Sequence, residues 1–85
     1  MKSRKIAYGT SNWVGKTIER LRKAEGITQR DFISRMQTMG LDINPTSYSK
    51  LEGQIRTASD KEIYVIAKLL NVPMEALFPA DIGGR

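Results

Sequence analysis

Apolar residues recur at three- and four-residue spacing in separate short blocks, which predicts a chain built of helices. The expected helices are about Asn12 to Gly26, Thr28 to Gly40, Pro45 to Glu52, Ser59 to Asn71, and Pro73 to Phe78. In the third of these, Tyr48 and Leu51 share one face, and the other faces are polar. No segment alternates convincingly between apolar and polar residues as a strand would. The pattern therefore predicts an all-α fold of five helices.

Capping residues support these boundaries. The predicted helix starts are Thr28 with Asp31 three residues later, Asn44 directly before Pro45, and Ser59 with Glu62 as a full capping box. Gly26, Gly40 and Asn71 are expected to end helices, because glycine and asparagine readily adopt the left-handed conformation found at helix ends. Each predicted helix therefore has its own local start or stop signal.

Composition limits the function classes. The 85 residues suit one domain, with a basic arm at residues 1–11, a helical domain at 12–79 and a flexible tail at 80–85. The chain has no cysteine and no histidine, which excludes disulfides, thiolate or imidazole metal sites and Cys/His or Ser/His/Asp nucleophiles. No apolar run approaches the length of a membrane span. We expect a cytoplasmic protein with no cofactor, no metal and no membrane contact. Acidic residues at predicted helix starts are explained by capping, so an enzyme is not expected.

Positive charge is concentrated in the first part of the chain. Residues 1–30 carry a net charge of +6, residues 31–56 are neutral, and residues 57–85 carry −1. A one-sided field of this kind attracts polyanions and gives salt-dependent affinity. Lysines and arginines that only solvate the surface of a small domain would give the same count. Charge alone favours neither interpretation.

Three segments together resemble a known family. The segments are IERLRKAEGITQ, SKLEG and DKEIYVIAKLLNVPMEALF, and the matching run covers about Val14 to Phe78. In this order and spacing they resemble the Cro and lambda-repressor type, or XRE-like, helix-turn-helix family. The resemblance implies a compact five-helix DNA-binding domain whose third helix enters a groove of the duplex. The segment QTMGLDI makes the connection before that helix longer than usual, and Pro45 stands where relatives often carry a base-reading side chain.

The resemblance, together with side-chain chemistry, implies site residues. We expect bases to be read by Thr46, Ser47, Ser49 and Lys50. We expect phosphates to be bound by Gln29, Arg30, Gln54 and Arg56. The resemblance also implies a partly buried ion pair between Arg22 and Glu52. Each assignment has a plainer alternative. The hydroxyl residues could be caps only, Gln29 could be an ordinary solvated residue, and Arg22 and Glu52 could be unrelated exposed charges. Tyr48 is expected in the core rather than stacked on a base.

The sequence thus predicts a sequence-specific double-stranded DNA-binding transcriptional regulator, a repressor of phage or mobile-element type. We expect a homodimer whose contact lies around Val72 to Phe78, where Met74, Leu77 and Phe78 are expected to be exposed. The alternative is an antitoxin with a toxin as partner, or a protein-interaction adaptor built on the same fold. An RNA binder is disfavoured because no basic sheet with stacking aromatic residues is expected.

Overall fold

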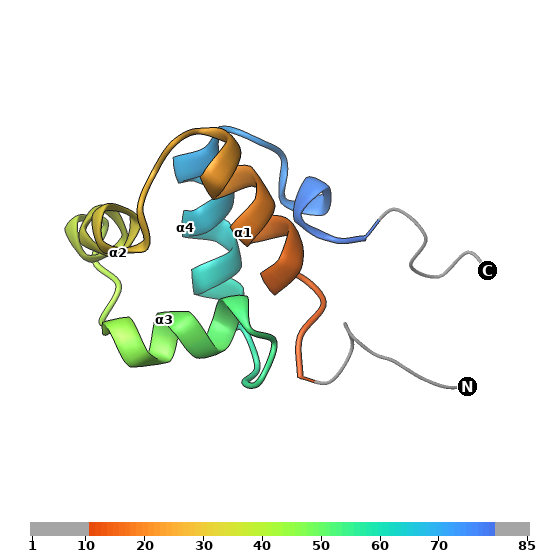
Figure 1. The fold of residues 1–85 in the computed structure, drawn as a ribbon, viewed down its shortest axis with the longest axis horizontal. Coiled ribbons are helices and arrows are strands. Elements are labelled where there is room, and N and C mark those ends of the chain that lie inside the picture. Colours follow the sequence, from red (N-terminus) through yellow and green to blue (C-terminus); the bar gives the residue numbers. More distant parts are fainter. Residues whose placement is uncertain (1–10, 80–85) are drawn as a thin grey trace.

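The computed structural model describes residues 11–79, and this part of the chain is all-helical (Figure 1). Its elements are α1 (Gly15–Ala24), α2 (Gln29–Thr38), α3 (Pro45–Glu52), α4 (Asp60–Leu70) and the 3-10 helix η2 (Met74–Leu77). No strand occurs between residues 11 and 79, and the all-α prediction is confirmed. The predictions of a basic arm and a flexible tail concern residues that lie, apart from Ser11, outside the described range.

The prediction of a fifth helix from Pro73 to Phe78 needs correction. The structure has only η2 there, a single 3-10 turn of four residues. Phe78, which follows it, already has an extended backbone with ψ of 152°. A residue before proline avoids the α-helical region, and Phe78 precedes Pro79. The second proline therefore stops the helix that Pro73 was expected to open.

The predicted helix caps are confirmed at α2, α3 and α4. The backbone N–H groups of Asp31, Ser47 and Glu62 donate to the side chains of Thr28 (3.1 Å), Asn44 (2.8 Å) and Ser59 (3.1 Å), respectively. The Ser59 N–H also donates to the Glu62 carboxylate, which completes the capping box. Asn71 ends α4 in the left-handed conformation, with φ of 59°. These signals act over three or four residues, which is why the sequence reveals them.

Helix α1 begins three residues later than the sequence predicts, because the Asn12 side chain binds backbone groups on both sides of it. Its Oδ1 accepts from the N–H groups of Val14 (3.0 Å) and Gly15 (2.8 Å). Its Nδ2 donates to the carbonyl oxygens of Leu51 (3.0 Å) and Arg56 (2.8 Å), at and beyond the end of α3. Asn12 therefore fastens the segment before α1 to the far end of α3.

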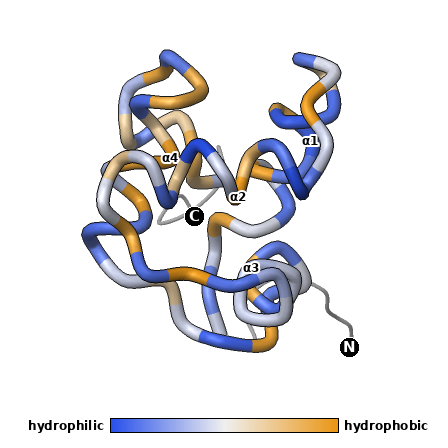
Figure 2. The backbone as a smooth tube through the Cα atoms, turned by 90° about the vertical axis from the view of Figure 1, so that its left-hand side faces the viewer, coloured by the Kyte–Doolittle hydropathy of each residue, from blue (hydrophilic) through white to orange (hydrophobic). Residues whose placement is uncertain are grey.

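The core lies where the four α-helices meet. Helix α3 packs on α1 and α2, while α4 packs on α1, α2 and η2. The fully buried large side chains are Val14, Ile18, Phe32, Met36, Tyr48, Leu51, Ile66 and Leu77. Tyr48 is in the core as predicted, but Leu77 was expected to be exposed and is fully buried. Figure 2 shows hydrophobic and hydrophilic stretches following one another along the described chain, with α3 mostly hydrophilic.

Candidate functional site

Helix α3 has a buried side and an exposed polar side. Tyr48, Leu51 and Glu52 are buried against the other helices. Thr46, Ser49 and Lys50 are exposed, and Ser47 is half-buried. Three of the four residues predicted to read bases thus lie on the open surface. The outer side of α3 carries hydroxyl groups and one ammonium group, all able to form hydrogen bonds.

Two hollows flank the beginning of α3. One, of about 580 Å³, is lined by residues that include Thr46, Lys50 and Arg56. The other, of about 450 Å³, lies between α2 and α3 and is lined by residues that include Gln29 and Arg30. Pro45 borders both. The first turns of α3 therefore form a ridge between two hollows, and each hollow has at least one cationic side chain on its wall.

A buried ion pair holds α3 on α1. Arg22 Nε donates to Glu52 Oε2 at 2.7 Å and Arg22 Nη2 donates to Oε1 at 3.1 Å, with only 6% and 3% of the two side chains exposed. The predicted pair is therefore confirmed, and it is almost fully buried. Arg22 Nη1 also donates to the carbonyl oxygen of Ile27, between α1 and α2 (2.7 Å). The guanidinium group thus connects three parts of the chain.

The Glu52 carboxylate also accepts from two further side chains. The Tyr48 hydroxyl donates to Oε2 at 2.5 Å, and Gln29 Nε2 donates to Oε1 at 2.9 Å. The sequence reasoning did not predict either contact. The spacing of Tyr48 and Glu52, four residues apart on one helix, was the available signal for the first. Three helices therefore meet at one carboxylate.

Burial and hydrogen bonding act in opposite directions on Glu52. Burial raises the pKa of its carboxyl group, but hydrogen bonds from Arg22, Tyr48 and Gln29 outweigh burial and hold the pKa below its ordinary value of 4.5. The hydrogen bond to Glu52 raises the pKa of Arg22. Burial and the neighbouring carboxylate raise the pKa of Tyr48 above its ordinary value. The network is therefore held as carboxylate, guanidinium and neutral phenol.

Gln29 connects this network to the outer side of α3. Its Nε2 donates to Glu52, and its Oε1 accepts from the exposed Ser49 hydroxyl at 3.1 Å. Gln29 is the first residue of α2, so it also lies beside the free N–H groups of that helix. Its amide is thus occupied by protein contacts on both sides. Arg30, the next residue, is exposed and has no contact of this kind among the described residues.

Arg56 is half-buried, and its guanidinium group is held by contacts within the protein. It donates to the carbonyl oxygens of Ser47 (2.8 Å) and Thr57 (2.7 Å), and it forms a two-pronged ion pair with Glu62 at 3.0 and 2.8 Å. Burial raises the pKa of the Glu62 carboxyl group, but the hydrogen bonds from Arg56 and Ser59 lower it by more. The pKa of Glu62 is therefore below its ordinary value. Arg56 therefore fastens the loop after α3 both to α3 and to α4.

Gln54, predicted to bind phosphate, is buried with 4% of its surface exposed. Its Nε2 donates to the Asn12 carbonyl oxygen at 3.2 Å. Its backbone is left-handed, with φ of 64°. The burial of Gln54 does not fit a phosphate contact by its side chain.

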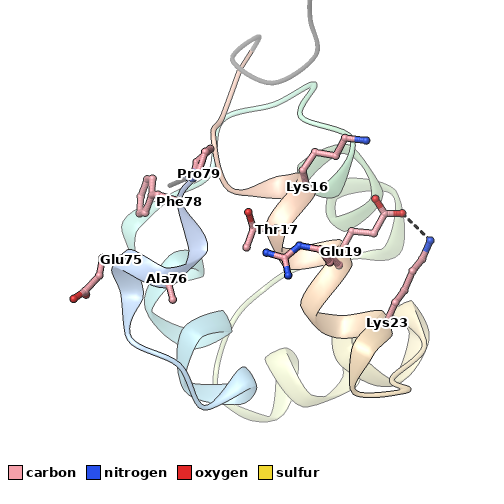
Figure 3. A pocket seen from close by; sticks show the side chains of 9 residues that line it. Lys16, Thr17, Glu19, Lys23, Glu75, Ala76, Phe78 and Pro79 are labelled. Atoms are coloured by element: carbon pink, nitrogen blue, oxygen red, sulfur yellow. Dashed lines mark ion pairs between the residues drawn. The ribbon is translucent and has the colours of Figure 1, made fainter. Parts of the chain in front are cut away.

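A separate groove of about 730 Å³ lies between α1 and η2 (Figure 3). Thr17 of α1 lies on the side toward Phe78 and Pro79, whereas the Lys16 side chain points away from them. Further along α1, Lys23 pairs with Glu19 at 3.1 Å on an exposed surface. Lysine and arginine residues thus extend along α1, although the groove also carries acidic side chains.

The described residues contain no cluster of acidic side chains able to hold a metal ion. None of the helices between residues 11 and 79 has both the length and the apolar character needed to cross a bilayer.

Comparison with known proteins leaves the family undecided. The chain matches no protein-family model, no curated protein and no solved structure. The resemblance described above therefore stays a prediction, and the functional argument rests on the site itself.

Proposed function

We propose that the chain is a sequence-specific double-stranded DNA-binding regulator of transcription, in which α2 and α3 act as a helix-turn-helix. The observation that carries this proposal is the exposed polar side of α3, supported from behind by the buried Arg22–Glu52 network. An α-helix with side chains is about 10–12 Å across, and the major groove is about 12 Å wide. The ridge between the two hollows has the shape that such a groove accepts.

Base reading would be done by Thr46, Ser47, Ser49 and Lys50. Lys50 can donate to guanine N7 or O6, and hydroxyl groups can donate to or accept from either type of base pair. Ser49 already donates to Gln29, so its hydroxyl oxygen is held in place and remains able to accept. We therefore expect Lys50 and Thr46 to contribute most to specificity.

The phosphates on both sides of the groove would lie over the two hollows. Arg30 and the N–H groups at the start of α2 would bind one strand, because helix N-termini attract anions. Arg56 and the loop that it fixes would face the other strand. We assign the Gln29 side chain to the positioning of α2 and α3 and its backbone N–H, at the start of α2, to the phosphate contact. The buried Gln54 side chain is not assigned a phosphate contact. A repressor of phage or mobile-element type is the role that the family resemblance supports, since occupancy of an operator is enough for repression.

An antitoxin or protein-interaction adaptor is the second candidate. Its support is three exposed apolar side chains, Met39, Tyr64 and Met74. They line one hollow, and no residue of α3 lines it. An adaptor would bind duplex DNA weakly and without sequence preference. DNA affinity and its salt dependence therefore separate the two candidates.

The test is selection of bound duplexes from a random pool, repeated with Lys50→Ala, Arg30→Ala and the control Lys23→Ala. We expect Lys50→Ala to relax preference at one position, at a cost of about 1–3 kcal/mol against the preferred base. Arg30→Ala should weaken all sequences alike and reduce the salt dependence. Lys23→Ala removes the same charge from an exposed position on α1 and should change neither property. Recovery of no preferred sequence by the unaltered chain would refute the proposal.

A further inference from the structure

Three polar side chains form a series of hydrogen bonds that runs from the core to the outer side of α3. Gln29 Nε2 donates to Glu52 Oε1 at 2.9 Å, and the Ser49 hydroxyl contacts Gln29 Oε1 at 3.1 Å. Glu52 is buried, Gln29 is half-buried and Ser49 is exposed. We call these three residues the Ser49 relay. Its outer end is a hydroxyl group on the exposed side of α3.

The Glu52 carboxylate fixes the orientation of the Gln29 amide. An ionised carboxylate can only accept hydrogen bonds. Glu52 is ionised near neutral pH, because hydrogen bonds from Arg22 and its other partners hold the pKa of its carboxyl group below 4.5. The Gln29 amide therefore turns its Nε2 toward Glu52 and its Oε1 toward Ser49. The reverse orientation would bring two acceptors together with no hydrogen between them.

This orientation in turn fixes the Ser49 hydroxyl. A serine hydroxyl has one hydrogen to donate and two lone pairs that accept. The hydrogen is used toward Gln29 Oε1, so the outward part of Ser49 Oγ presents lone pairs. Turning the hydrogen outward would leave Ser49 Oγ and Gln29 Oε1 as two acceptors 3.1 Å apart. Ser49 therefore meets a ligand as an acceptor, although an isolated serine could also donate.

An outward acceptor distinguishes between base edges in the major groove. The donors on these edges are the N6 amino group of adenine and the N4 amino group of cytosine, whereas guanine O6 and N7 and thymine O4 are acceptors. Ser49 would thus form a hydrogen bond with adenine or cytosine and be repelled by guanine or thymine. Lys50, the next residue, can only donate and favours the opposite kind of edge.

We propose that Ser49 selects a base with an exocyclic amino group, adenine or cytosine, and that Gln29 is the positioning residue that sets this preference. The inference rests on the proposed function for the contact between α3 and the major groove. It adds the chemical class of base that one position accepts, and it makes that choice depend on an α2 side chain that does not itself touch the base.

The first test is selection of bound duplexes by the full chain, repeated with Ser49→Ala and Gln29→Met. We expect the unaltered chain to prefer adenine or cytosine at one position by about two- to tenfold, the range for one hydrogen bond between neutral groups. Ser49→Ala should abolish this preference. Gln29→Met keeps the hydroxyl but releases its hydrogen, so guanine and thymine should become acceptable at that position alone.

Gln37→Met is the matched control for the change in Gln29. Gln37 also belongs to α2 and lines the same hollow as Gln29, but it donates to the Ile43 carbonyl oxygen at 2.8 Å. We expect this variant to keep the adenine or cytosine preference. Arg22 and Tyr48 still donate to Glu52 in Gln29→Met, and circular dichroism checks that its helices are retained.

The second test removes the amino group from the duplex. Purine in place of adenine, or 2-pyrimidinone in place of cytosine, lacks the donor at the selected position. The loss of affinity should be about two- to tenfold larger for the unaltered chain than for Ser49→Ala, because the variant has no acceptor to lose. Any weakening of the base pair by the analogue is common to both proteins and cancels in this ratio. Equal losses would overturn the inference.

The outcomes separate this inference from the proposed function. A preference for guanine or thymine at the position that Ser49→Ala relaxes would overturn the inference alone. So would relaxation of different positions by Ser49→Ala and Gln29→Met, or equal weakening of all sequences by Gln29→Met. Ser49→Ala leaves the bond between Gln29 and Glu52 in place, so it remains informative if Gln29→Met unfolds. An unaltered chain that selects no sequence would refute the proposed function, and the inference with it.

Discussion

Replacement of Glu52 by alanine removes the acceptor on which α1, α2 and α3 converge. The substitution leaves the Arg22 guanidinium buried with its hydrogen bond to the Ile27 carbonyl oxygen and no carboxylate partner, and it also removes the acceptor of the Tyr48 and Gln29 side chains. Removal of one member of a buried ion pair typically costs about 3–5 kcal/mol. A domain of this size has a total stability of roughly 4–13 kcal/mol, at about 0.05–0.15 kcal/mol per residue. We therefore expect Glu52→Ala to remove a large part of the free energy of unfolding.

The assay is urea unfolding followed by far-ultraviolet circular dichroism. Glu19→Ala is the control, because Glu19 forms an exposed pair with Lys23 on α1 and such pairs contribute about 0.3–0.5 kcal/mol. Glu52→Gln keeps the shape and one oxygen acceptor and should fall between the two. If Glu52→Ala unfolds the chain outright, Glu52→Gln still gives a measurable value.

A double substitution tests whether the loss comes from the isolated charge. Arg22→Met combined with Glu52→Leu removes both charges and refills the space with apolar groups, which is often nearly neutral. We expect the double variant to be more stable than the sum of the single losses predicts, by at least about 1 kcal/mol. Single losses no larger than that of Glu19→Ala, or strict additivity, would refute the assignment of Glu52 as the central acceptor.

Three further predictions concern stability. Gly15→Ala should cost about 1–3 kcal/mol in thermal unfolding, because an added Cβ would lie against the Leu51 carbonyl oxygen and 2.7 Å from that of Glu52; an unchanged Tm would mean that α1 and α3 are not in close contact. Asn71→Ala should cost about 1 kcal/mol, because the residue holds φ of 59° at the end of α4, and Asn71→Gly should be tolerated; equal losses for both would point to a side-chain role instead. Acid should weaken the fold: the pKa values of Glu52 and Glu62 lie below 4.5 in the folded chain, so their contribution is present above the unfolded pKa and is lost as pH falls through the folded values. Urea midpoints that stay constant from pH 7 down to about pH 3 would contradict this sign.

The helix boundaries were largely predictable because their signals are local. Thr28, Asn44 and Ser59 each cap a helix through a contact only three residues away. Asn71 ends α4 through its own backbone conformation. Besides the shortened last helix, the late start of α1 is an exception, and it arises because Asn12 also binds carbonyl groups about forty residues away. Pattern reasoning has no access to such a partner.

The position of the candidate site was predictable from the sequence. The burial and the contacts of its individual side chains were less predictable. The α3 residues and the Arg22–Glu52 pair lie where the sequence placed them. Arg56 was expected to be available to a duplex, but its ion pair with Glu62 depends on how the loop folds back onto α4. Gln54 looks like a surface residue in sequence, and only the left-handed backbone after Gly53 turns it inward. Leu77 is buried because η2 returns to the core.

The Asn12 contacts decide where any upstream extension of the chain must emerge. Because this side chain holds the carbonyl groups of Leu51 and Arg56, Ser11 departs next to the carboxyl end of α3. Residues 1–10, and any purification tag or fused protein in front of them, therefore join the described domain beside the end of α3. Functional assays with such fusions should therefore be repeated after the extension has been cleaved off.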